Sequence, residues 1–385
     1  MGQWDLSSEL DELKHRELYR SRQIIDGAQG PTVQINGVAF DNFSSNDYLG
    51  LANHPAVIKT FQQAAENYGV GSGSAHLICG HSAEHHALEE ELAEFTGRER
   101  ALVFSTGYMA NLGAIAGLVQ KGDEVFQDKL NHASLIDGGR ISGAGVKRFS
   151  HSDMSRLQQL LETSSADKKL IVSDGVFSMD GDEANIKDLV VLAGKSKAML
   201  MIDDAHGMGV LGESGAGLIE KYGLSQQQVP ILMATFGKAL GTSGAFVAGS
   251  EELIETLIQK ARTYIFTTAM PAAVMAATRE SLKIAQQETW RRDKLTSLVV
   301  RFRRGAEQLG LSLMPSETPI QPVILGSNSA VLSASSYLKE KGILVGAIRH
   351  PTVRKSTERL RITLSATHSE AQVDKLLLRL EEVIC

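Results

Sequence analysis

Hydrophobic and polar positions along the chain form alternating blocks from about residue 101 onward. Short, continuous apolar runs are separated by stretches with helical periodicity, and the runs occupy residues 101–104, 124–128, 169–174, 198–204, 231–236 and 245–250. Runs of this kind are typical of strands buried on both faces, and their alternation with helices is typical of a parallel sheet. The sequence therefore predicts an α/β fold with a mostly parallel central sheet and helices on both faces.

The segments on either side of this block follow different patterns. Residues 5–20 are predicted to form a polar, amphipathic helix that packs on another domain or subunit. Residues 271–286 have the pattern of a long helix, which would lead into a smaller α+β part. The expected parts are an N-terminal helix and arm (1–45), a large domain (46–270) and a smaller C-terminal domain (271–385).

Composition narrows the class of protein. The chain has 385 residues, 43% of them hydrophobic, which exceeds what one ordinary domain needs. A net charge of -6 without a strongly basic segment argues against a nucleic-acid partner. The two cysteines, Cys79 and Cys385, lie far apart and favour a reducing compartment. Neither a signal-peptide core nor a long apolar run occurs, so we expect a cytoplasmic protein without a membrane partner.

Polar and small residues cluster directly after the predicted strands. In an open α/β sheet, ligands bind beyond the carboxyl ends of the strands. A binding or catalytic site is therefore expected where these ends meet. The segments that follow the strands are 105–108, 128–132, 174–178, 203–206 and 235–238.

Lys238 is the first candidate for chemistry, because it follows the apolar run 231–236 in the small-residue turn TFGKALGTSG. Partial burial of a lysine lowers its pKa and makes the neutral amine nucleophilic. An ordinary surface lysine is the alternative for this residue taken alone.

Other candidates follow neighbouring strands. A buried carboxylate at Asp203 needs a cationic partner, and a protonated pyridine nitrogen is such a partner. His206 and Ser178 are placed to contact the phenolic oxygen of the same ring, and His132 to stack on it. Residues 106–108 open a helix whose backbone amides suit a phosphate. A capping Asp and a structural His are the alternatives where only one residue is considered.

A glycine-rich segment raises a different possibility. Residues 207–212 match G-x-G-x-x-G after a predicted strand, as in nicotinamide-dependent dehydrogenases. A dinucleotide site requires a long helix at this point, whereas residues 213–218 (ESGAGL) contain two further glycines. The sequence therefore disfavours a dehydrogenase.

A group of histidines raises the possibility of a metal site. It consists of His76, His81, His85 and His86, and His81 and His85 have the i, i+4 spacing of helix-borne ligands. No carboxylate or cysteine in the pattern completes a convincing ligand set. We therefore expect no metal here, and a structural or substrate-facing role for the group.

Taken together, these segments resemble the α-oxoamine synthases, which are fold-type-I pyridoxal-phosphate enzymes. The resemblance runs from about Leu18 to the end of the chain. It is carried by NFSSNDYLGL (42–51), GSGSAHLICG (71–80), HHALEEELAEFTG (85–97), LNHASLIDG (130–138), GVFSMDGD (175–182), IDDAHGMGVLGESGAG (202–217), TFGKALG (235–241) and RLRITLSA (359–366). It implies a fold-type-I transferase fold with pyridoxal 5'-phosphate as cofactor.

Enzymes of this family join an amino acid to an acyl thioester and release carbon dioxide. The segment AIRHPTV (347–353) resembles the IRPPTV of members that condense L-alanine with pimeloyl-CoA or pimeloyl-acyl-carrier protein in biotin biosynthesis. Members that use glycine are the closest alternative. Two segments depart from the family pattern, VRKSTE (353–358) in a loop and Ala75-His76 in the glycine-rich piece.

The resemblance also implies roles for individual residues. Lys238 would carry the cofactor as a Schiff base and abstract the substrate proton, Asp203 would pair with the ring nitrogen, and His132 would stack on the ring. The enzyme would be a homodimer with shared active sites. The further roles are contact with the phenolic oxygen (Ser178, His206), phosphate binding (Gly107, Tyr108, Thr235, with Thr267 and Thr268 from a second subunit) and substrate binding (Arg361 for the amino-acid carboxylate, Arg20 and Thr352 for the acyl group, and Asn46).

Overall fold

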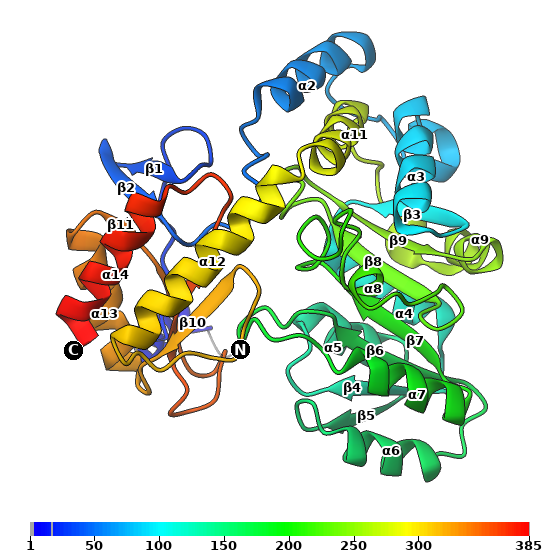
Figure 1. The fold of residues 1–385 in the computed structure, drawn as a ribbon. Coiled ribbons are helices and arrows are strands. Elements are labelled where there is room, and N and C mark those ends of the chain that lie inside the picture. The colour runs from blue at the N-terminus through cyan, green and yellow to red at the C-terminus, as the bar shows by residue number, and fades with distance from the viewer. Residues whose placement is uncertain (1–3, 17, 385) are drawn as a thin grey trace.

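The computed structural model describes residues 4–16 and 18–384. Residues 1–3 of the predicted N-terminal arm, Glu17 in the predicted first helix, and Cys385 lie outside this range. Figure 1 shows a large α/β part and a smaller part, with the long helix α12 (Trp290–Gln308) running between them.

The large part is built on a seven-stranded sheet with the order β3-β9-β8-β7-β6-β4-β5. Only β9 is antiparallel to its neighbours, so the prediction of a mostly parallel sheet is confirmed. The strands are β3 (Arg100–Phe104), β4 (Glu124–Asp128), β5 (Gly145–Phe149), β6 (Lys169–Asp174), β7 (Met199–Asp203), β8 (Ile231–Thr235) and β9 (Ala245–Gly249). The apolar pattern predicted all of them except β5, an edge strand with a mostly exposed, basic centre.

Helices cover both faces of this sheet because successive strand residues point to opposite sides. Val125 packs with α4 and α9 on one face, and its neighbour Phe126 packs with α6 and α7 on the other. The helices of this part are α2 (Pro55–Tyr68), α3 (Ala83–Thr96), α4 (Gly107–Leu118), α5 (Ala133–Ile141), α6 (Met154–Glu162), α7 (Ile186–Ser196), α8 (Leu218–Lys221), α9 (Glu251–Lys260), α10 (Arg262–Ile265) and α11 (Ala272–Gln287), with a π-helix η1 (His76–Gly80). None of the helices in the described ranges has the length and apolar composition to cross a membrane.

The smaller part combines C-terminal and N-terminal segments. An antiparallel sheet has the order β10-β13-β12, and β11 pairs with β2 of the N-terminal hairpin β1-β2. These elements are β1 (Thr32–Ile35), β2 (Val38–Asn42), β10 (Ile320–Ile324), β11 (Ile343–Leu344), β12 (Gly346–Ile348), β13 (Arg359–Thr363), α13 (Asn328–Glu340) and α14 (Glu370–Ile384). The predicted α+β character is thus confirmed.

Two features bear on the predicted division of the chain. Helix α11, which follows the expected boundary at residue 270, packs on α2 and α3. Helix α1 (Leu6–His15) is shorter than predicted and buries none of its described residues. The boundaries at 45 and 270 stay predictions, as does the docking of the first helix on another subunit.

A tight turn after β8 fixes the position of Lys238. The amide of Gly241 donates a hydrogen bond to the Lys238 carbonyl at 2.9 Å, and Gly241 has a left-handed φ of +64°. A Cβ atom on Gly241 would lie 2.3 Å from the amide nitrogen of Ala52. The turn therefore requires glycine both for its conformation and for its close approach to the chain at Ala52.

Replacing Gly241 with alanine should destabilise the protein more than the same change at Gly310. Both glycines are left-handed, which costs alanine about 1–2 kcal/mol, but nothing lies within 4 Å of a Cβ at Gly310. The overlap at Gly241 adds about 1–3 kcal/mol. Unfolding midpoints of the two variants measure the difference, and equal midpoints would show that the turn is not constrained as described.

Candidate active site

The carboxyl ends of the parallel strands lie side by side in register. Asp174 at the end of β6 is the partner of Asp203 at the end of β7, and Asp203 is in turn the partner of Met233 in β8. Lys238 follows β8 within a few residues. The sheet register therefore brings together the strand ends at which the sequence placed its candidates.

Lys238 forms the first link of a short polar chain. Its Nζ lies 2.8 Å from Nε2 of His206, and Nδ1 of His206 lies 2.6 Å from the hydroxyl of Tyr48. Burial lowers the pKa of Lys238 to about 8, although Asp203 and Asp174 oppose that shift. Burial also lowers the pKa of His206 far below its ordinary value, with Lys238 adding to the effect. The site therefore holds a neutral imidazole against an amine that loses its proton easily.

Tyr48 is a functional residue that was not singled out from the sequence. It is fully buried, burial raises its pKa to about 12, and its hydroxyl also lies 3.3 Å from Oδ1 of Asn46. The hydroxyl therefore stays protonated at neutral pH. Tyr48 lies in the segment NFSSNDYLGL (42–51), which carries part of the family resemblance, and this was the sequence signal that could have identified it.

The carboxylate of Asp203 is buried and held on both oxygens. Oδ2 accepts a hydrogen bond from the Asn111 amide at 2.7 Å, and Oδ1 accepts one from the Ala205 backbone at 3.1 Å. Asn111 lies in the otherwise apolar helix α4 and was also missed by the sequence pattern. These two donors fix the orientation of a carboxylate that is suited to face a cationic ring nitrogen.

His132 caps helix α5 beside this carboxylate. Its backbone amide donates to Asp174 at 2.6 Å, and its Nδ1 lies 2.7 Å from the Ser134 hydroxyl. Burial lowers the pKa of His132. Burial and the neighbouring Asp203 raise the pKa of Asp174 well above its ordinary value. The imidazole of His132 is thus kept neutral, with its ring held at Nδ1 by Ser134 and its backbone held by Asp174.

Arg361 reaches the site from β13 of the smaller part. Its Nε donates to the Ser178 carbonyl at 2.6 Å, and its Nη2 donates to Asn46 at 3.1 Å. Only 8% of the residue is exposed. A guanidinium fixed in this way presents its remaining donors for a carboxylate.

A cavity of about 640 Å³ opens beside His132 and Ser178. Most of its wall is apolar, and Thr352 lies at its rim among the residues of the loop 352–357. The apolar lining residues include Leu130, Ile136, Phe177, Met179, Met314, Ile324 and Val353. The cavity is therefore suited to an aliphatic chain.

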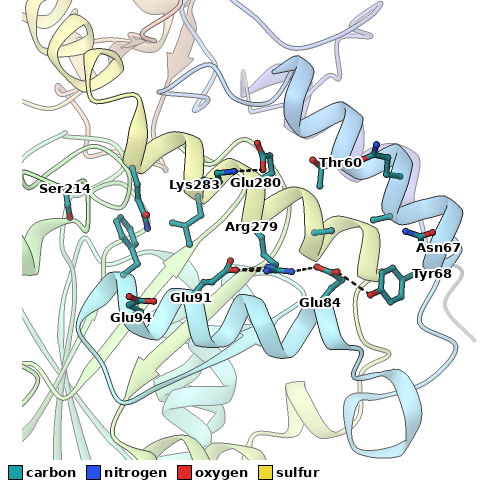
Figure 2. Close-up of a pocket in the computed structure, with 16 residues that line it drawn as sticks. Thr60, Asn67, Tyr68, Glu84, Glu91, Glu94, Ser214, Arg279, Glu280 and Lys283 are labelled. Atoms are coloured by element: carbon teal, nitrogen blue, oxygen red, sulfur yellow. Dashed lines mark hydrogen bonds and ion pairs between the residues drawn. The ribbon is translucent and has the colours of Figure 1, made fainter.

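A second cavity of about 840 Å³ lies between α2, α3 and α11 (Figure 2). Arg279 lies at its centre, bound to Glu84 and Glu91 at 2.7 Å each. None of its lining residues is a predicted site residue. This larger cavity is therefore not the candidate active site.

The N-terminus of α4 supplies an anion site at the same sheet edge. Thr106 caps the helix by accepting the Met109 amide, which leaves the amides of Gly107 and Tyr108 at the helix end. A Cβ at Gly107 would lie 3.1 Å from Met233 and 3.9 Å from Thr235. The helix end and the end of β8 thus form a close cradle, which suits a phosphate.

Some predicted residues are not joined to this group. The hydroxyl of Tyr108 donates to Asp137, Thr268 forms an isolated bridge with Ala75, and Arg20 is exposed. In the described part of the chain, no hydrogen bond or ion pair links Arg20, Thr267 or Thr268 to the residues around Lys238. Their predicted roles are not tested by a single chain.

The donor set fits pyridoxal 5'-phosphate. It comprises an amine with a lowered pKa, a buried carboxylate, two imidazoles whose pKa values are lowered, and a helix N-terminus. Asn111, which donates to the carboxylate of Asp203, has a buried Oδ1 without a hydrogen-bond partner in the described part of the chain. Lys238, Asp203, His132 and His206, together with Gly107 and Thr235, would hold the group.

Comparison with known proteins agrees with this geometry. The family model of class I and II aminotransferases matches residues 40–380. The 8-amino-7-oxononanoate synthase of Saccharophagus degradans is 58% identical over 99% of this chain and 96% of its own length. That of Pseudomonas aeruginosa is 55% identical over 98% and 94%. The chain belongs to the α-oxoamine synthases.

Solved structures of related enzymes agree with this family assignment. A Sphingomonas wittichii serine palmitoyltransferase has a TM-score of 0.94 at 33% identity, covering 99% of this chain and 98% of its own. An 8-amino-7-oxononanoate synthase from Francisella tularensis has a TM-score of 0.78 at 30% identity, covering 89% and 97%. A variant of the serine palmitoyltransferase of S. paucimobilis, with a TM-score of 0.93 at 30% identity, contains a bound PLP–myriocin aldimine. The predicted fold-type-I fold and the predicted cofactor, pyridoxal 5'-phosphate, are confirmed.

In the cofactor-free protein, the Lys238 amine should react with an acylating reagent with a pH midpoint near 8 instead of the ordinary 10.5. Because the lowered pKa leaves the amine neutral above pH 8, labelling should rise through that pH. Asp203→Asn removes a charge that favours the ammonium form, so it should shift the midpoint lower still. Pulsed acetic anhydride labelling across pH, read by mass spectrometry with an exposed lysine as reference, measures both. A midpoint near 10.5 would refute the described environment.

Proposed function

We propose that the chain catalyses the condensation of L-alanine with a pimeloyl thioester to give 8-amino-7-oxononanoate, carbon dioxide and a free thiol. The observation that carries this proposal is the 55–58% identity, over nearly the whole chain, to synthases of this activity. Identity to the serine palmitoyltransferases is lower, at 30–33%. The reaction is a decarboxylative acyl transfer.

Arg361 is proposed to bind the alanine carboxylate. Its guanidinium is held by Ser178 and Asn46, so its plane is fixed before the substrate arrives. A planar guanidinium binds a carboxylate through two parallel hydrogen bonds, which a lysine cannot reproduce. The clamp therefore sets the orientation of the amino acid relative to Lys238.

Lys238 is proposed to remove the Cα proton of the bound amino acid. Pyridoxal 5'-phosphate, when bound, supplies an electron-poor ring that stabilises negative charge at Cα. The Asp203 carboxylate, held by Asn111 and Ala205, would keep the ring nitrogen protonated. His206 lies 2.8 Å from Nζ and is neutral, so it does not add a competing positive charge beside the base.

The acyl group is proposed to lie in the cavity beside His132. Its apolar wall suits the methylene chain of a pimeloyl group, and Thr352 lies at its rim. Arg20 is proposed to face the same substrate, and its side chain is exposed in the single chain. Either coenzyme A or an acyl-carrier protein can supply the thioester in this proposal.

Purified protein supplied with an amino acid and an acyl thioester provides the direct test. L-alanine with pimeloyl thioesters should give the fastest thiol release, and glycine with acetyl-CoA should be poor. Arg361→Lys should raise the KM for alanine far more than that for the thioester, because only the carboxylate loses its bidentate partner. Fastest turnover with glycine, or an equal loss for both substrates in the variant, would contradict the proposal.

We also propose that two copies of the chain form a homodimer with shared active sites. Thr267 and Thr268 follow α10, and in the described part of the chain no hydrogen bond joins them to Lys238, while the resemblance assigns them to the phosphate of a second subunit. A two-fold axis would let each chain complete the other. The cytoplasmic location expected from the sequence stays a prediction.

Subunit complementation tests the shared site. A Lys238→Ala chain and a chain with Thr267→Ala and Thr268→Ala should each be nearly inactive. In a mixed dimer one site collects both lesions and the other neither, so about half of the sites should be intact by symmetry. Activity should reappear after subunit exchange, and verified mixed dimers without activity would exclude the model.

A further inference from the structure

Four histidines gather around the N-terminus of α3, away from the residues described above. His85 is satisfied within the fold, because its Nε2 lies 2.9 Å from the Met270 carbonyl and its Nδ1 2.8 Å from the Ser82 hydroxyl. His76 stacks on Tyr264 with ring centroids 4.7 Å apart. Structural roles thus account for two of the four, and His81 and His86 remain.

Glu89 lies beside these two remaining histidines, one helical turn after His86. Its Oε1 accepts the Val103 amide at 2.9 Å, and its Oε2 lies 3.8 Å from Nε2 of His81. One ligand atom from each of His81, His86 and Glu89 lies within 4.8 Å of the other two. The carboxylate that the sequence pattern did not supply is therefore present in the fold.

We propose that His81, His86 and Glu89 bind one divalent transition-metal ion, with Zn²⁺ as the best-suited ion. Two imidazoles and one carboxylate are a ligand set that zinc accepts, with water in the fourth position. The His86 side chain is largely exposed and the Glu89 side chain only 12% exposed. An ion would therefore reach the site from solvent and bind against a fixed carboxylate.

His76 orients the first of these ligands. Its Nδ1 lies 3.0 Å from Nδ1 of His81. In the tautomer in which His81 Nδ1–H donates to His76, the Nε2 of His81 has a free lone pair, and this atom lies 3.8 Å from Glu89. Metal-binding histidines commonly have such a partner for their second ring nitrogen. The stack on Tyr264 holds the His76 ring in place.

Glu89 is the buried acidic member of this group. Its ion-pair partner in the described chain is His81, with Nε2 3.8 Å from Oε2. His86 pairs with Glu90 at 3.4 Å on the exposed side. A dication between these groups would supply the positive charge that the buried carboxylate lacks.

A bound ion would join two segments that are separate in the chain. His81 follows η1, whereas His86 and Glu89 lie in α3. The segment before η1 forms a bridge with Thr268 through Ala75. The ion would therefore fix η1 against α3. Through the bridge between Ala75 and Thr268, it would also fix the position of η1 relative to the Thr267–Thr268 segment.

Zinc binding to the holoenzyme, purified without a histidine tag and treated with chelator, provides the test. Competition with a chromogenic chelator should show one Zn²⁺ per chain. His86→Gln and Glu89→Gln should each weaken binding by at least about 100-fold, and His76→Phe by about 10–100-fold, as for an outer-shell partner. His15→Gln, on the exposed helix α1, is the matched control and should bind like the wild type.

Both ligand variants are expected to fold. His86 is exposed, and a glutamine at position 89 keeps an oxygen for the Val103 amide. Visible absorption of Co²⁺ added in place of zinc reports the ligand geometry separately from affinity and should be lost in both variants. Absence of stoichiometric zinc in the wild type, or unchanged affinity in His86→Gln and Glu89→Gln, would overturn the proposal.

Discussion

The burial of one amine at the end of β8 is the constraint on which the rest of the site depends. Burial is the largest effect that lowers the pKa of Lys238, and the charge of Arg361 adds to it, while Asp203 and Asp174 favour the charged form. More carboxylates around Lys238 would keep the amine protonated. A wholly apolar environment would remove the carboxylate that pairs with the cofactor's ring nitrogen. With the observed balance, the Lys238 amine can both gain and lose a proton near neutral pH.

This balance requires the strand ends to be in register. Asp174 and Asp203 occupy partner positions in β6 and β7, so a shift of either strand by one residue would turn its aspartate to the opposite face. The turn that carries Lys238 is then fixed by the close approach of Gly241 to Ala52. Sheet register and turn geometry together set which charges the amine meets.

Much of this arrangement follows from local pattern, and the rest from contacts across long stretches of chain. The apolar runs predicted every strand of the large sheet except β5, and the strand-end rule predicted that Lys238 and Asp203 lie at the carboxyl edge of that sheet. Tyr48 contacts His206 across 158 positions, a relation that no local pattern expresses. Asn111 looked like one polar residue in an apolar helix, and only the fold directs it at Asp203.

The same limit explains the edge strand and the histidine group. Strand β5 pairs only with β4, so its exposed centre needs no apolar run and the pattern cannot mark it. Glu89 follows His86 by three residues, and its carboxylate also accepts a hydrogen bond from the Val103 amide of β3. The sequence does not show that the fold brings this carboxylate beside His81. A ligand set that combines a loop residue with residues on one helix face can be recognised only when the position of the loop against the helix is known. For this reason the sequence pointed to the residues around Lys238 more readily than to a group formed by His81 after η1 and two residues of α3.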